Sequence, residues 1–264
     1  MMALFDAAAN GLAITAAPAV AERKCRRSIC LDFTTCGPSR WLEGEGGVLR
    51  KALFTGFLLV LGIWAWSSPI SLIVFNPERA GSDSGPEAWH IHVTKGTPDI
   101  ARVPGEQFPE LRLRSRKASF GLERNFDVNL KEFPYLNWRW KVTQLPDGGD
   151  FRSSLSDDQA AQVLVVFPDR RILTYLWDSS APKGTAQPAS YLPMVHIFAF
   201  VCRSGPAERN QWLAETRNLV DDFRKAFGFA PERVKGLRLQ INSQHTGTFA
   251  ESYFGEVAFL RTPQ

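Results

Sequence analysis

The sequence has little cysteine and no large excess of charge of either sign. Only four of its 264 residues are Cys, and Cys202 is the single one after residue 36. No disulfide can therefore form within residues 76–264. Those residues carry 24 basic against 22 acidic side chains, and the whole chain has a formal charge of +4. Such a nearly balanced surface lacks the footprint of a phosphate binder, so we expect no nucleic-acid partner.

Signature motifs of several enzyme classes are also missing. The chain contains no GxxxxGK[ST], no GxGxxG between a strand and a helix, no HExxH and no GxSxG. These absences exclude the usual P-loop nucleotide site, zinc peptidase site and α/β-hydrolase nucleophile, although other enzymes need none of them. We therefore expect no cofactor and favour a non-catalytic function, with an enzyme kept as the alternative.

An uncharged stretch of 24 residues, from Ala52 to Phe75, follows the basic pair Arg50-Lys51. A bilayer core needs about 20 apolar residues in a helix, so this segment predicts a membrane contact through residues 52–75. Two interpretations stay open for residues 48–75. The Ala65-Trp66-Ser67 triplet favours a cleaved signal peptide, whereas the apolar run that resumes after Pro69 favours a transmembrane anchor. Either one places residues 76–264 outside the cytoplasm of a bacterium, as a periplasmic domain anchored in the inner membrane or as a secreted one.

The remaining organisation follows from composition. Residues 1–47 show no sustained period and precede the export signal, so we interpret them as a poorly structured leader from a start site placed too far upstream. Residues 76–88 are polar and predict a linker, and residues 89–264 form the folded domain.

Most of that domain predicts β-strands. In Tyr135–Val142 the side chains of Leu136, Trp138, Trp140 and Val142 share one face, and polar side chains share the other. Residues 236–242 alternate in the same way, and Phe167-Pro-Asp-Arg-Arg-Ile172 predicts a hairpin turn. Only Leu219–Phe227 has helical spacing, closed by Gly228. About eight or nine strands with one short helix indicate an all-β antiparallel sandwich of the jelly-roll type.

Several of these segments, taken in order, resemble the bacterial family of unknown function DUF3047 over roughly residues 90–261. The segments are Pro134–Val142, Ser156–Ala161, Val165–Phe167, Thr174–Trp177 and Trp212–Gly228. The resemblance implies an exported β-sandwich, similar to carbohydrate-binding jelly rolls and without an established activity. That family tends to carry an Asp-rich turn after its penultimate strand. Here the turn is Asn242-Ser-Gln-His-Thr246, so a metal or acid/base role for it is in doubt.

Acidic side chains between residues 150 and 158 are the first candidate site. Asp157 and Asp158 are predicted to lie on a loop, where they either cap local backbone amides or contact a ligand. A hydrolase or lyase would need one of them and a second carboxylate within about 5–10 Å. Asp150 and Asp157 are also weak candidates for a structural calcium ion, since hard cations take oxygen ligands.

Aromatic side chains and one arginine are the second candidate. Sugar rings stack on Trp and Tyr faces, but alternating strand aromatics more often belong to the core. Because Trp138 and Trp140 share a face with Leu136, we expect them in the core. Tyr175 and Trp177, beside Asp178, are expected to line a cleft. Arg139 lies on the polar face of its strand and has the geometry to bind a ligand carboxylate.

We therefore predict an envelope protein that binds a glycan or another polar envelope component, with Asp157, Asp158, Tyr175, Trp177, Asp178 and Arg139 as candidate ligand-binding residues. The alternatives are a glycan-active hydrolase or lyase that uses the 150–158 loop, and an envelope assembly protein that pairs through a sheet edge.

Overall fold

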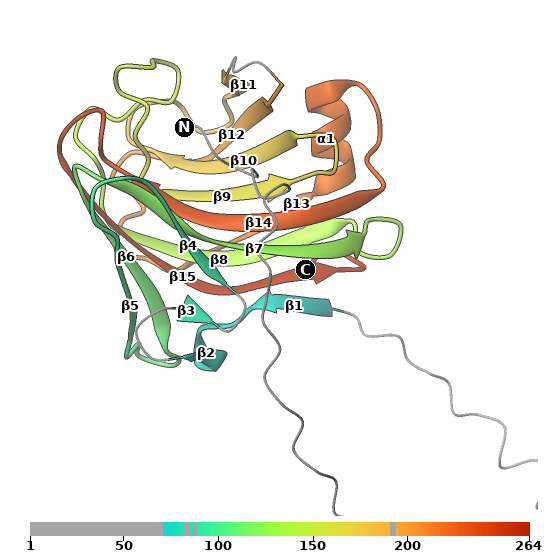
Figure 1. Ribbon diagram of the computed structural model, residues 1–264, viewed down its shortest axis with the longest axis horizontal. Helices are drawn as coiled ribbons and strands as arrows, with labels where there is room; N and C mark the ends of the chain where they lie inside the picture. Colours follow the sequence, from blue (N-terminus) through green and yellow to red (C-terminus); the bar gives the residue numbers. More distant parts are fainter. Residues whose placement is uncertain (1–70, 82–84, 87–88, 191–193) are drawn as a thin grey trace, which may run out of the picture. The chain divides into compact units, whose positions relative to one another are not determined.

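Two β-sheets packed face to face make up most of the part of the chain that the structure describes (Figure 1). A computed structural model of the chain describes residues 71–81, 85–86, 89–190 and 194–264. The described residues form fifteen strands, one α-helix and one short 3-10 helix, η1 (Pro77–Arg79). The class is all-β with mostly antiparallel pairs, as predicted, although the strands outnumber the eight or nine expected.

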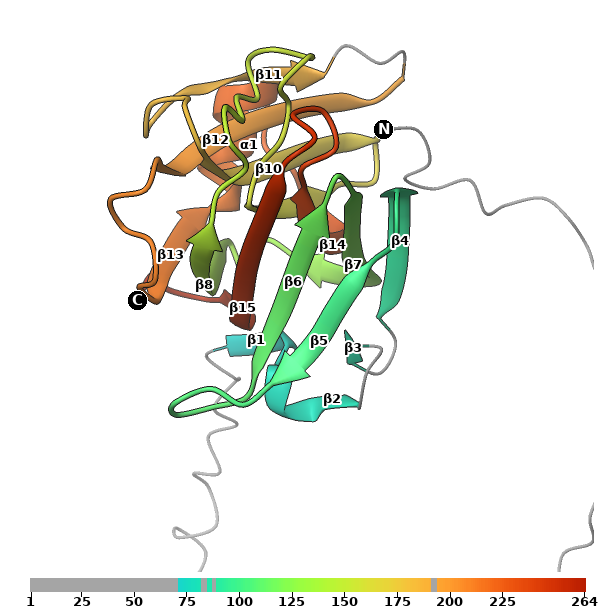
Figure 2. The same ribbon diagram turned by 90° about the vertical axis from the view of Figure 1, so that its left-hand side faces the viewer.

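The first sheet has six strands, and five of them lie side by side in Figure 2. In spatial order these are β13 (Leu213–Asn218), β8 (Tyr135–Gln144), β15 (Phe249–Leu260), β6 (Glu110–Arg116) and β5 (Asp99–Val103). The sixth strand, β1 (Ser71–Phe75), pairs with the end of β15. All pairs in this sheet are antiparallel.

The second sheet has seven strands. Their order is β11 (Ala186–Ser190), β12 (His196–Ser204), β10 (Arg171–Asp178), β9 (Ala161–Val166), β14 (Arg233–Asn242), β7 (Ser119–Asn129) and β4 (His90–Lys95). The pair β10–β12 is parallel, which corrects the fully antiparallel sandwich that we expected. A two-stranded ribbon, β2 (Ala80–Gly81) and β3 (Gly85–Pro86), completes the strands.

The core lies between the two sheets and is rich in aromatic rings. Trp138 and Trp140 on β8 point inward with no exposed surface, which confirms the period-two prediction. The ring centroid of Trp138 lies 5.1 Å from that of Tyr175, and the centroid of Trp140 lies 5.9 Å from that of Trp177; both partners are on β10 of the other sheet. Such tilted and edge-on contacts contribute about 0.5–1.5 kcal/mol each beyond the burial of apolar area.

The predicted helix is present as α1 (Leu219–Phe227). Asn218 caps it, because its side-chain oxygen accepts from the amides of Val220 and Asp221 at 3.1 and 3.3 Å. Gly228 ends it in the left-handed conformation, with φ of 85°, and donates to Arg224 O at 2.8 Å. The predicted hairpin is also confirmed, as β9 and β10.

The start of the folded domain differs from the prediction. Ser71–Phe75, assigned above to the membrane segment, is strand β1, and Val74 and Phe75 are buried. A short run of β-branched and apolar residues fits a strand as well as the end of a span, so sequence alone does not separate them. The sandwich thus includes β1, which precedes the expected boundary at 89, and η1 lies within the expected linker. Among the described residues, no helix is long and apolar enough to cross a bilayer; the remainder of residues 48–75, and all of 1–47, lie outside them.

Candidate functional site

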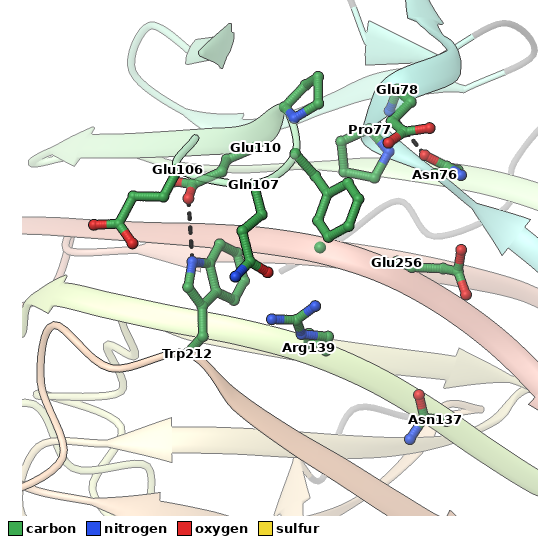
Figure 3. A pocket seen from close by; sticks show the side chains of 13 residues that line it. Asn76, Pro77, Glu78, Glu106, Gln107, Glu110, Asn137, Arg139, Trp212 and Glu256 are labelled. Carbon is green, nitrogen blue, oxygen red and sulfur yellow. Dashed lines mark hydrogen bonds between the residues drawn. The ribbon is translucent and has the colours of Figure 1, made fainter. Parts of the chain in front are cut away.

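A cavity of about 590 Å³ opens on the outer face of the six-stranded sheet (Figure 3). Four segments far apart in the sequence, together with Trp212, surround it. The lining residues are Asn76, Pro77, Glu78, Glu106, Gln107, Phe108, Pro109, Glu110, Asn137, Arg139, Trp212, Gly255 and Glu256. This volume lies within the range of small-ligand sites.

Strand β8 supplies the floor of the cavity. Asn137 and Arg139 alternate with the core residues Trp138 and Trp140, so they necessarily point to the outer face. The amide nitrogen of Asn137 donates to Thr216 Oγ1 at 2.9 Å, which fixes its orientation. Arg139 is exposed and, among the described residues, forms no ion pair. Its guanidinium carbon lies 5.5 Å from the centroid of the Trp212 ring.

Trp212 stands just before β13 and is held from several sides. Its indole Nε1 donates to Glu110 Oε1 at 3.1 Å, and Figure 3 shows this bond. Glu110 in turn accepts from Lys141 Nζ at 3.0 and 3.3 Å and is buried. The same ammonium lies 4.9 Å from the Trp212 ring centroid. These contacts orient the ring before a ligand arrives, which lowers the entropic cost of binding.

A β-bulge in β15 lies beside Arg139 and Trp212. The register between β15 and β8 shifts between Phe254 and Val257, so Gly255 and Glu256 together oppose the single residue Arg139. A Cβ at position 255 would lie 3.2 Å from Arg139 Cβ and 3.6 Å from Trp212 Cζ3. The first of these distances is tight, so glycine favours the close approach of Arg139, whereas the second is an ordinary van der Waals contact. The Glu256 side chain, next in the bulge, is exposed.

Of the six predicted ligand-binding residues, Arg139 lines this cavity and the other five do not. Tyr175 and Trp177 have no exposed surface. The Tyr175 hydroxyl donates to Asp222 Oδ2 at 2.8 Å, and burial raises the pKa of this phenol well above its usual value. Trp177 Nε1 donates to Gly205 O at 3.2 Å. Neither ring offers a face on which a sugar can stack, so their place in the core differs from the cleft expected for them.

Asp178 is a buried cap of local backbone. Its Oδ1 accepts from the amides of Ser180 and Ala181 at 2.9 and 2.7 Å, and its Oδ2 accepts from Phe151 N at 3.0 Å. Burial raises the pKa of the carboxyl, whereas these three amides lower it. Because both of its carboxylate oxygens accept hydrogen bonds, the Asp178 side chain connects the loop that contains Phe151 to the loop that follows β10.

Asp157 and Asp158 connect their loop to the turn at residues 242–246. Asp158 has no exposed surface, and its Oδ2 accepts from Thr246 N at 2.6 Å. His245 Nδ1 lies 3.5 Å from the other oxygen of Asp158 and 3.0 Å from the backbone oxygen of Asp157. Burial raises the pKa of Asp157 to about 6, and a bond from Gln159 opposes the rise. These side-chain contacts therefore reach the distant turn at 242–246 and the side chain of Gln159, rather than the local backbone amides that the sequence suggested.

The two calcium candidates, Asp150 and Asp157, each bond a neighbouring side chain. Both carboxylate oxygens of Asp150 accept from the guanidinium of Arg152, at 2.8 and 2.6 Å. Asp157 accepts from Gln159 Nε2 at 3.1 Å. Within the part of the chain that the structure describes, no three His, Cys, Asp or Glu side chains are grouped as metal ligands.

Sequence patterns missed most of the cavity. Glu110, Glu256 and the residues at 76–78 and 106–109 show no motif, and they come together only through strand pairing. The one local signal was Gly255, a glycine inside an alternating strand pattern, which often marks a bulge or a close approach.

The comparisons with known proteins assign the family. Residues 99–258 match the model of the family described as "Protein of unknown function (DUF3047)", and the chain belongs to that family. This confirms the resemblance noted from the sequence. No curated protein matches the chain.

Solved structures with a similar fold come from several organisms. One is the xyloglucanase domain of NopAA, a type three effector from Sinorhizobium fredii, in complex with cellobiose (TM-score 0.43, 10% identity, 70% of this chain and 98% of that one). Another is endoglucanase Cel12A from Rhodothermus marinus (TM-score 0.42, 9% identity, 74% of this chain and 100% of that one). A third is the family 11 carbohydrate-binding module of a Clostridium thermocellum cellulase (TM-score 0.40, 7% identity, 74% of this chain and 97% of that one). At such low identities and TM-scores, these similarities carry no argument about function.

Proposed function

We propose that the protein is an exported, non-catalytic binding protein that takes a glycan into the cavity on the six-stranded sheet. One observation carries the proposal: Arg139, which forms no ion pair within the described residues, lies beside the oriented ring of Trp212 in a cavity of about 590 Å³. An aromatic face packs against the C–H groups of a sugar ring, and planar polar side chains bond its hydroxyls.

The other lining residues fit the same ligand class. Asn76, Gln107 and Asn137 supply amides, and Glu78, Glu106 and Glu256 supply carboxylates, all of which bond sugar hydroxyls. Phe108, 54% exposed, adds a second apolar surface at the rim. A catalytic role finds less support, because the buried acid of the cavity, Glu110, is occupied by Lys141 and Trp212.

A glycan array followed by calorimetry on the full chain tests this proposal. We expect Trp212→Ala and Arg139→Ala each to weaken binding about 5–30-fold, which corresponds to roughly 1–2 kcal/mol. Phe229→Ala and Arg233→Ala are matched controls, since both side chains are exposed and lie outside the lining residues. Absence of binding to any envelope or plant glycan, or full binding by Trp212→Ala, would refute the proposal. Release of reducing sugar from a bound glycan would favour the enzyme instead.

For location, we propose export directed by the apolar residues before β1. The basic pair Arg50-Lys51 and the uncharged residues that follow support this. Since Ser71–Phe75 form a strand, the apolar run after Pro69 no longer argues for an anchor over a cleaved signal. A cut after Ser67 would leave β1 whole. Cell fractionation with mass spectrometry of the mature N-terminus tests export; recovery of the domain in the cytoplasm alone would contradict it.

A further inference from the structure

The cavity on the six-stranded sheet is acidic, although the rest of the domain is nearly neutral. Its lining contains four glutamates and one arginine. Lys141 lies next to it and balances Glu110, at 3.0 Å. The remaining charged groups of the lining are therefore three carboxylates, those of Glu78, Glu106 and Glu256, and one guanidinium, that of Arg139.

These three carboxylates are unlike their neighbours on the same sheet face. There, Glu251 is paired with Arg114, and Asp99 with Arg112 at 3.0 Å. Glu78, Glu106 and Glu256 are exposed and have no ion pair within the described residues. Within the described residues, this face therefore has paired carboxylates at Asp99 and Glu251 and carboxylates without an ion pair where the cavity opens.

The unpaired carboxylates are distributed around the rim. Figure 3 shows Glu106 on one side, Glu256 on the opposite side and Glu78 near Asn76. They do not form a metal-ligand group within the described residues, and they come from three separate segments. Such spacing suits cations carried at intervals on a larger ligand better than a single metal ion, which needs several oxygens within about 2.6 Å.

We infer that the glycan bound here carries free amino groups, as in a chain of unacetylated hexosamines; this rests on the proposed function. In that arrangement a sugar ring packs on Trp212, and Arg139 and Asn137 bond ring hydroxyls. Ammonium groups of the ligand face the carboxylates of Glu106 and Glu256. A uronic-acid chain would find a single guanidinium against three like charges, and like charges in contact disfavour binding.

Calorimetry on the full chain tests the inference with three hexasaccharides: glucosamine, N-acetylglucosamine and galacturonic acid. At about pH 6 and low salt, we expect the glucosamine chain to bind at least roughly tenfold more tightly than the acetylated one. This preference should shrink at about 300 mM salt, because exposed charges are screened.

Variants separate the charge effect from the stacking effect. Glu256→Gln and Glu106→Gln should each weaken binding of the glucosamine chain about three-fold more than binding of the acetylated chain, because the new amide still bonds hydroxyls but carries no negative charge. Glu232→Gln removes the same charge from an exposed residue outside the lining and should change nothing. Trp212→Ala should weaken binding of both amino-sugar chains.

The outcomes distinguish the two proposals. Equal affinity for the glucosamine and acetylated chains, or an unchanged preference in both Gln variants, overturns the inference and leaves glycan binding in place. Tightest binding of the galacturonic-acid chain also overturns it. If neither these chains nor any array glycan binds, the proposed function fails and the inference with it.

Discussion

Replacing Asp157 by asparagine should stabilise the protein at neutral pH. The carboxyl is largely withdrawn from water, beside the carboxylate of Asp158, and burial is the main reason that its pKa rises from 3.8 to about 6. The hydrogen bond that its side chain accepts from Gln159 Nε2 at 3.1 Å can be kept in the variant, because the new amide oxygen is also an acceptor, although a neutral acceptor bonds less strongly than a carboxylate. The substitution thus removes a partly desolvated charge and leaves the packing in place.

The sign and size follow from the two protonation states. A pKa that is higher in the folded chain means that the folded state holds the proton more tightly, so this group favours folding at low pH. That contribution is complete below about pH 3.8 and is lost as the pH rises through about 6. The full shift corresponds to at most about 3 kcal/mol. Because the side chain keeps some contact with water, we expect a gain of about 1–2 kcal/mol for Asp157→Asn at neutral pH.

Urea unfolding of both proteins between about pH 4 and pH 8 measures this difference. The gain should be largest above pH 7 and vanish near pH 4. Asp147→Asn is the matched control, since Asp147 is exposed and lies on the same long loop. A gain that does not change with pH would refute the desolvation argument, as would a loss of stability at neutral pH.

Two further predictions concern buried carboxylates and use the same unfolding assay. Asp158→Ala should cost about 1–3 kcal/mol, because it leaves the amide of the half-buried Thr246 without the acceptor that the buried carboxylate supplies; a cost no larger than that of Asp157→Ala would contradict this. Asp222→Ala should cost about 3–5 kcal/mol, since it strands both Tyr175 Oη and the guanidinium of Arg217, which bonds the carboxylate at 2.6 and 2.8 Å. Tyr175→Phe should cost only about 1–2 kcal/mol, and a larger loss than for Asp222→Ala would reverse the ranking.

Local patterns predicted the elements whose two faces differ. Strand β8 has one buried and one polar face, so alternation alone placed Trp138 and Trp140 in the core and Arg139 outside. The helix was predicted from its apolar spacing and from Gly228 at its end, and the structure adds Asn218 as its N-cap.

Alternation failed where both faces of a strand are covered. On β10 the residues from Ile172 to Asp178 are all buried, including Thr174 and Leu176 on the face opposite Tyr175. A strand of this kind has no polar face to orient it, so the positions of Tyr175 and Trp177 depended on tertiary packing. The proximity of Asp178 suggested a cleft, whereas that carboxylate binds backbone amides.

The cavity could not be predicted because it depends on register between distant strands. Gly255 and Glu256 oppose a single residue of β8, Arg139, which lies more than a hundred positions earlier in the chain. Without the bulge, β15 would continue its alternation past Phe254 and Glu256 would point into the core. With it, Val257 returns to the core opposite Trp138, and the glutamate is among the residues that line the cavity. The residues that break the regularity of the sheet therefore supply one of the charges on which ligand binding is proposed to depend.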